Sequence, residues 1–144
     1  MDRRRSPLKA VIDTNVVAYL LLGTEKFAEE ARECMTTVVD PWAPAVWEAE
    51  LANTLWMAVR HKVLSLADAT GRLTLADGLG IHTISNRHLW KGALTRAHTA
   101  NVAVYDALFV ELAVRERVPL ATFDNGLLRA FPDVARRPGR IARR

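Results

Sequence analysis

The sequence has very little cysteine, no long apolar run and no internal repetition. Cys34 is the only cysteine in 144 residues, which excludes an internal disulfide and favours a reducing, cytoplasmic compartment. No segment approaches the roughly 18 consecutive apolar residues of a membrane helix, so no membrane span is expected. Repeats, low-complexity segments and linkers are also lacking. We therefore expect one soluble domain covering residues 1–144.

The histidines lack any metal-binding pattern. His61, His82, His88 and His98 show neither an H-x-x-x-H spacing nor a cysteine partner. We assign none of them to a metal. Any metal chemistry in this chain must therefore come from carboxylates.

What the sequence does contain is a balance typical of a globular protein, with 50% hydrophobic and 25% charged residues. The net charge of +4 is unevenly placed, because arginines gather at Arg3, Arg4, Arg5, Arg136, Arg137, Arg140, Arg143 and Arg144. These two basic tails, 1–7 and 135–144, have two interpretations that the sequence leaves open. They are either arms that hold phosphates by counterion release or simply solvated, frayed ends.

Apolar periodicity predicts strands that alternate with helices. The expected strands are 8–12, 36–44, 81–85 and 119–123, and the expected helices are 15–22, 25–35, 44–60, 65–79, 87–99, 104–117 and 125–131. This alternation favours an α/β fold with a largely parallel sheet.

Three local features refine these boundaries. Pro44 is placed in the first turn of the helix 44–60, and Ser65 with Asp68 resembles a capping box. The helix 44–60 is apolar on nearly every face, which predicts burial in the core or in a subunit interface.

Two aspartates follow predicted strands directly. Asp13 comes after the strand 8–12, and Asp124 comes after the strand 119–123. Ligands of parallel α/β sheets bind beyond the carboxyl ends of the strands, so these two acids are candidates for one site. Each could instead be a plain helix N-cap, although the repetition of the pattern weakens that alternative.

Helical spacing adds further acids. Asp106 shares a face with Val110 and Ala113, where an ion is costly unless it is paired or bound to metal. Glu48 and Glu50 point in nearly opposite directions on the helix 44–60, so one site can use only one of them. Apolar neighbours flank both, and periodicity leaves this choice open.

Clustered carboxylates without thiolates suit Mg²⁺ or Mn²⁺, because hard cations prefer oxygen ligands and separate like charges. A cation held in this way orients and activates water and stabilises displacement at phosphorus. The acids therefore indicate metal-dependent phosphoryl chemistry.

Four segments together resemble the PIN-domain family, and within it the VapC-type toxin ribonucleases of toxin–antitoxin systems. These segments are "VIDTNVVAYLL" (11–21), "PAVWEAELANTLW" (44–56), "VYDALFVELA" (104–113) and "LATFDNGLLRAFPDV" (120–134). They occur in the family's order and spacing, whereas residues 61–100 match only in helical character.

This resemblance implies specific roles. The family pattern selects Glu50 over Glu48, because its second acid precedes an apolar-Ala-Asn run. The family's metal-binding and catalytic roles then fall on Asp13, Glu50, Asp106 and Asp124, with Asn15 and Thr122 as polar support.

The resemblance also implies the activity and the partners. The implied fold is a parallel sheet of about five strands between helices. The implied activity is endonucleolytic cleavage of RNA with Mg²⁺ (magnesium) or Mn²⁺, which would inhibit translation. A VapB-like antitoxin whose tail blocks the site, and a homodimer, are the implied partners.

Two other functions are compatible with parts of the pattern. A haloacid-dehalogenase-type phosphatase would use Asp13 as nucleophile, but Asn15 stands where its second aspartate belongs, and no lysine precedes the late acid. A non-catalytic RNA-binding PIN module is the other alternative, and such a module should have lost acids that are all present here.

Overall fold

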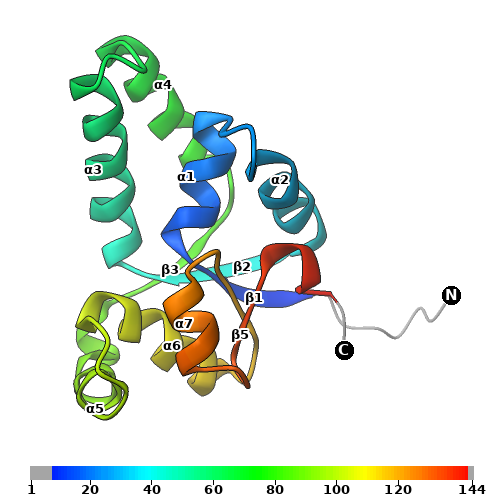
Figure 1. Ribbon diagram of the computed structural model, residues 1–144, viewed down its shortest axis with the longest axis vertical. Coiled ribbons are helices and arrows are strands. Elements are labelled where there is room, and N and C mark those ends of the chain that lie inside the picture. The colour runs from blue at the N-terminus through cyan, green and yellow to red at the C-terminus, as the bar shows by residue number, and fades with distance from the viewer. Residues whose placement is uncertain (1–7, 143–144) are drawn as a thin grey trace, which may run out of the picture.

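A parallel five-stranded sheet carries the fold in this computed structural model, which describes residues 8–142 (Figure 1). The elements in chain order are β1 (Lys9–Ile12), α1 (Thr14–Leu22), α2 (Ala28–Thr37), β2 (Asp40–Pro44), α3 (Val46–Arg60), α4 (Leu66–Asp77), β3 (His82–Ile84), the 3₁₀ turn η1 (Asn86–His88), α5 (Trp90–Ala100), α6 (Val104–Glu116), β4 (Leu120–Ala121), α7 (Asn125–Ala130), β5 (Ala135–Arg136) and the 3₁₀ turn η2 (Pro138–Arg140). The predicted α/β class and largely parallel sheet are confirmed.

The strand order β3-β2-β1-β4-β5 places β1 at the centre of the sheet. Val11 in β1 pairs with Trp42 on one side and with Leu120 on the other. Since the chain leaves β1 in one direction and returns to β4 on its opposite side, the carboxyl ends of β1 and β4 form a topological switch point. This is the place where α/β sheets open a crevice.

Helices cover both faces of the sheet. Figure 1 shows α1 to α4 on one side and α5 to α7 on the other. The core between these layers is formed by residues 10–12 of β1, by α1 residues such as Val16 and Val17, and by Phe109 and Leu112 of α6. No helix within residues 8–142 is both long enough and apolar enough to cross a bilayer.

The start of α3 differs from the prediction. Pro44 ends strand β2 rather than opening the helix, which begins at Val46. The N–H of Ala45 donates to Ile84 O in β3 at 2.8 Å, so position 44 faces the β1 side of the strand. The pairing of β2 with β1 ends at Trp42, two residues before Pro44. The missing N–H of Pro44 therefore removes no hydrogen bond between these strands.

The expectation of a basic tail over residues 135–144 is wrong for residues 135–142. Ala135 pairs with Leu120 to add strand β5 to the sheet. Arg137 then makes a two-point ion pair with Glu30 on α2, at 3.2 and 2.7 Å, and Ile141 is buried. The predicted basic tail at 1–7, and residues 143–144, lie outside the described residues.

Helix α3 is only partly buried. Trp47, Leu51 and Leu55 face the core, whereas Trp56 and Met57 are 53% and 37% exposed. The prediction of burial therefore holds for one face within this single chain. The predicted cap of α4 is confirmed in part, since the hydroxyl of Ser65 accepts the N–H of Asp68 at 3.0 Å.

A buried carboxylate joins α5 to α6. Glu111 accepts bonds from Arg96 at 2.7 Å and from Arg115, four residues later on α6, at 2.6 Å. A Cβ added at Gly92 would come closer than 3.0 Å to this carboxylate. A methyl group at position 92 would therefore have to displace this carboxylate, which two arginines hold in place.

Replacing Gly92 by alanine is expected to lower the free energy of unfolding by about 1–3 kcal/mol, because the methyl group overpacks the buried carboxylate. The matched control is Gly71→Ala in α4, where nothing lies within 4 Å of the added Cβ. That change should raise the free energy of unfolding by about 0.5–1 kcal/mol through helix propensity. Urea unfolding of both variants checks this, and stabilisation by both would contradict it.

Candidate active site

A cleft of about 310 Å³ opens at the switch point of the sheet, beyond the ends of β1 and β4. Its lining residues are Asp13, Thr14, Asn15, Ala18, Tyr19, Glu50, Thr54, Asp106 and Asp124. The structure thus brings together all four carboxylates singled out from the sequence, from four separate segments of the chain.

Asp13 lies at the end of β1 and is only 6% exposed. It occupies the N-cap position of α1, but its side chain makes no capping bond. Instead, its Oδ2 accepts the Thr122 hydroxyl at 2.7 Å and Asn15 Nδ2 at 3.4 Å. Simple N-capping therefore does not account for this aspartate.

The protonation of Asp13 follows from its surroundings. Burial raises the pKa of its carboxyl group to about 7. The hydrogen bond from Thr122 opposes this rise, while the nearby charges of Asp106 and Glu50 add to it. Without a cation, burial and the neighbouring carboxylates therefore disfavour the charged form of Asp13.

Asp124 is both the N-cap of α7 and a lining residue of the cleft. Its Oδ1 accepts the N–H of Leu127 at 3.1 Å and caps α7, as the capping alternative predicted. Its carboxyl group also lines the cleft. The cap and a role in the cleft are compatible, since capping engages one of the two oxygens.

The structure separates the two glutamates of α3. Glu50 is half-buried in the cleft, and its Oε1 accepts the Thr14 hydroxyl at 2.7 Å, whereas Glu48 is exposed. Burial raises the pKa of Glu50, and the Thr14 bond opposes that rise. Thr14, which was not among the predicted site residues, is therefore the hydrogen-bond donor to Glu50.

Asp106 lies in the first turn of α6 and is half-buried. Burial raises the pKa of its carboxyl group, and the charge of Asp124 raises it further. Its side chain makes no hydrogen bond to any residue between 8 and 142. Among the four acids it has the least support from the protein.

The hydroxyl of Thr122 connects the two strand ends. Thr122 is fully buried, accepts the N–H of Asp124 at 3.0 Å and Asn15 Nδ2 at 3.4 Å, and donates to Asp13. Asn15 Oδ1 in turn accepts the N–H of Phe123 at 3.3 Å. Both residues chosen as polar support thus contact the site's central aspartate.

Sequence reasoning missed Ala18, Tyr19 and Thr54 as cleft residues. Helical spacing could have found them. Ala18 and Tyr19 lie one turn after Thr14 and Asn15, and Thr54 lies one turn after Glu50, so each shares a face with a residue of the site.

The donor set of the cleft fits a hydrated divalent cation. Four carboxylates line it, and no lysine or arginine is among its lining residues. Within the described part of the chain, no three acidic, histidine or cysteine side chains stand close enough to form a ready-made metal group. Mg²⁺ commonly keeps several waters and takes only one or two carboxylates directly, which such a spacing suits.

Comparisons with known proteins agree with this arrangement. The family model of the PIN domain matches residues 10–133. Ribonuclease VapC3 of Pyrobaculum aerophilum is 28% identical over 129 residues, covering 87% of this chain and 96% of the relative.

Two solved structures share the fold, each with a TM-score of 0.63. One is a toxin–antitoxin complex from Klebsiella pneumoniae, 15% identical, over 90% of this chain and 97% of that chain. The other is VapBC2 from Rickettsia felis bound to a DNA fragment from its promoter, 12% identical, over 90% and 98%. With its parallel sheet, its acidic cleft and the match over residues 10–133, the chain belongs to the PIN-domain family.

Proposed function

We propose that this chain is a VapC-like toxin, a metal-dependent endoribonuclease that hydrolyses RNA phosphodiester bonds and thereby inhibits translation. The observation that carries the proposal is the gathering of four carboxylates in one cleft of a PIN domain. The similarity to Ribonuclease VapC3 supports RNA as the substrate class.

In this proposal Asp13, Glu50, Asp106 and Asp124 hold Mg²⁺, for which Mn²⁺ can substitute. When bound, the ion lowers the pKa of a water and stabilises charge at phosphorus. The chain's own residues prepare the acids: Thr122 and Asn15 orient Asp13, and Thr14 orients Glu50. Asp13 must release its proton before it can bind a cation, so metal binding is coupled to pH.

We also propose a VapB-like antitoxin as the partner that blocks the cleft. Its support is that the two structural neighbours are a toxin–antitoxin complex and VapBC2. The half-exposed apolar face of α3 is compatible with a homodimer or an antitoxin surface. A cytoplasmic location remains a prediction from the cysteine content.

The residues around Asp13 disfavour the phosphatase alternative. Asn15 stands where such an enzyme has its second aspartate, and its amide is already engaged with Asp13 and Thr122. The retention of all four acids likewise disfavours a non-catalytic module.

The test is cleavage of single-stranded RNA by the purified protein, freed of antitoxin. We expect RNA fragments with Mg²⁺ or Mn²⁺ and none with a chelator, and no hydrolysis of a small aryl phosphate. Sequencing the 5′ ends of the fragments identifies the cut sites. Hydrolysis of the aryl phosphate through a phosphorylated Asp13, or RNA cleavage that the chelator leaves unchanged, would refute the proposal.

The two glutamates of α3 provide a matched pair of variants. Glu50→Gln is expected to reduce the cleavage rate by about 10- to 100-fold, since it removes a charge from the cleft. Glu48→Gln makes the same chemical change on the exposed face of the same helix and should leave the rate unchanged. Single-turnover cleavage assays compare them, and equal effects would remove Glu50 from the site.

A further inference from the structure

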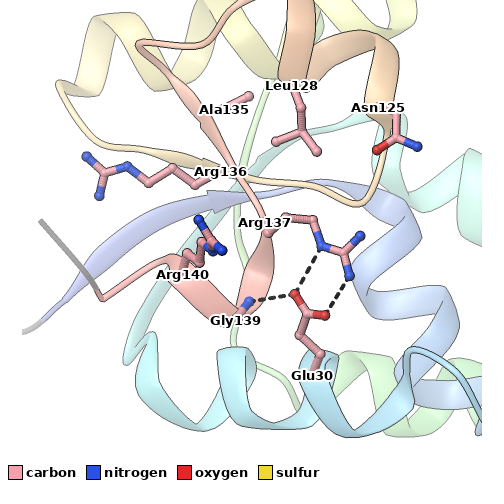
Figure 2. A pocket seen from close by; sticks show the side chains of 8 residues that line it. All are labelled: Glu30, Asn125, Leu128, Ala135, Arg136, Arg137, Gly139 and Arg140. Atoms are coloured by element: carbon pink, nitrogen blue, oxygen red, sulfur yellow. Dashed lines mark hydrogen bonds and ion pairs between the residues drawn. The ribbon is translucent and has the colours of Figure 1, made fainter.

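A second pocket, of about 1000 Å³, has the opposite electrostatic character (Figure 2). It is formed by α2, α7, β5 and η2, and it is lined by Arg136, Arg137 and Arg140 together with Glu30 and Asn125. Among the described residues that line this pocket, three are arginines and one, Glu30, is an acid. Because Glu30 pairs with Arg137, the charge of Arg140 is the one considered for ligand binding.

This basic pocket lies directly beside the acidic cleft. Asp124 lines the cleft, and the next residue, Asn125, lines the pocket. The ring of Phe123 also spans the two: it meets Tyr19, a cleft residue, edge-on with centroids 5.2 Å apart, and its centroid lies 4.9 Å from the Arg137 guanidinium. Phe27 completes this contact, since its ring stacks on Tyr19 at 4.7 Å and its centroid lies 5.8 Å from the Arg137 guanidinium.

Arg137 and Arg140 have different surroundings in this pocket. Arg137 is fixed by its two-point ion pair with Glu30, which also accepts the N–H of Gly139 at 2.8 Å (Figure 2). These three bonds from Glu30 on α2 hold η2 in place. Arg140, on η2, is exposed, and its side chain makes no hydrogen bond or ion pair within residues 8–142, although it lies close enough to Glu30 to lower the pKa of that carboxyl group.

We propose that the basic pocket binds a backbone phosphate of the RNA strand, next to the phosphate held in the acidic cleft. This inference rests on the proposed ribonuclease function. The charged residues that line the cleft are all acids, so positive charge for an RNA strand has to come from elsewhere along the same strand. Arginine forks match phosphate oxygens in geometry and charge, and phosphate contacts of this kind position a strand.

We choose RNA over an acidic peptide because a strand with one phosphate in the cleft continues with further phosphates, and the cleft has no lysine or arginine among its lining residues to match their charge. The bound phosphate fixes the position of the RNA strand, so that the neighbouring phosphodiester bond lies in the acidic cleft. Arg140 is thus a positioning residue, and Arg137 with Glu30 holds the segment that presents it.

The test uses Arg140→Gln in an Asp13→Asn background, so that RNA is bound but not cut. The dissociation constant of a short single-stranded RNA is measured between 50 and 200 mM salt. Loss of one phosphate contact should flatten the slope of log affinity against log salt by about 0.7 and weaken binding several-fold at low salt. Arg140→Lys, which keeps the charge, should restore most of the slope.

The matched control is Arg60→Gln, an exposed arginine at the far end of α3 that makes the same charge change. It should leave the slope unaltered. An Arg140→Gln slope equal to that of the parent, or an equal loss in Arg60→Gln, would overturn the proposal. So would an unchanged RNA slope combined with weakened binding of a glutamate-rich peptide, which would assign the pocket to a protein partner.

Failure of this inference can be told apart from failure of the proposed function. If the wild-type protein cuts RNA but Arg140→Gln leaves the salt slope unchanged, only the phosphate pocket is refuted. If Arg140→Gln flattens the slope but the wild-type protein cuts no RNA with either metal, the pocket stands and the ribonuclease proposal fails.

Discussion

Asp13→Asn is expected to lower the rate of RNA cleavage by about 100-fold or more. The substitution keeps the size of the side chain and an oxygen that can accept the Thr122 hydroxyl, but it removes the charge that would hold a cation. Even residues that only orient metal ligands contribute 10- to 100-fold to affinity or activity, so a direct ligand should contribute at least as much. Single-turnover cleavage at saturating Mn²⁺ measures the effect.

Binding of RNA separates a catalytic loss from a structural one. The dissociation constant of Asp13→Asn for an RNA substrate should stay within about threefold of the wild-type value, because phosphate contacts come mainly from basic side chains. A variant that keeps more than a tenth of the wild-type rate would show that Asp13 is dispensable. Loss of RNA binding together with cleavage would point to a folding defect.

The same substitution should stabilise the metal-free protein at neutral and alkaline pH. The pKa of Asp13 is about 7 in the folded chain against an ordinary value of 3.8. Between these values the folded protein binds one proton more than the unfolded chain, so the free energy of unfolding falls as pH rises from about 4 to 7. The fall is at most about 1.4 kcal/mol per pH unit and stops once the folded protein has also lost the proton.

Asparagine cannot titrate, so the difference in unfolding free energy between Asp13→Asn and wild type isolates this contribution. Below pH 4 the free energy of unfolding should respond to pH similarly in the two proteins. Between pH 4 and pH 8 the free energy of unfolding of the variant should rise relative to that of the wild type by about 2–4 kcal/mol. Saturating Mg²⁺ or Mn²⁺ should narrow that gap by stabilising only the wild type. Urea unfolding at several pH values measures it, and a difference that is independent of pH would contradict the prediction.

The sheet was predictable wherever its strands carry their own apolar pattern. The β-branched run at Val11 and Ile12 could be read directly, since burial on both faces favours such residues. Strand β3 was also predicted, within 81–85, although its residues His82 and Thr83 are exposed. Strand β5 could not be predicted, because it has only two residues, Ala135 and Arg136, and an alternating apolar pattern cannot be recognised in two residues. Their placement depends on β4 and on the ion pair of Arg137 with Glu30, which are tertiary features.

The site was predictable to the extent that its residues follow strand ends or repeat along a helix. Asp13 and Asp124 could be placed together because parallel strands end at one edge. The choice between Glu48 and Glu50 could not be made from periodicity, because the direction of α3 relative to the sheet decides which face meets the cleft. Thr14 was missed as a hydrogen-bond donor for the same reason, since its partner is 36 residues away.

The hydrogen bonds of Thr122 have a mechanical consequence. The ends of β1 and β4 are joined by that hydroxyl and by the backbone bond from Asp13 N–H to Ala121 O at 2.9 Å, so Asp13 and Asp124 form a stiff pair. Glu50 and Asp106 stand on separate helices with one side-chain bond between them and their surroundings. The side of the cleft formed by Asp13 and Asp124 is therefore held by the sheet, whereas the side formed by Glu50 and Asp106 has few bonds to hold it. Under the proposed function, the second side is the one that would adjust to cations of different radius.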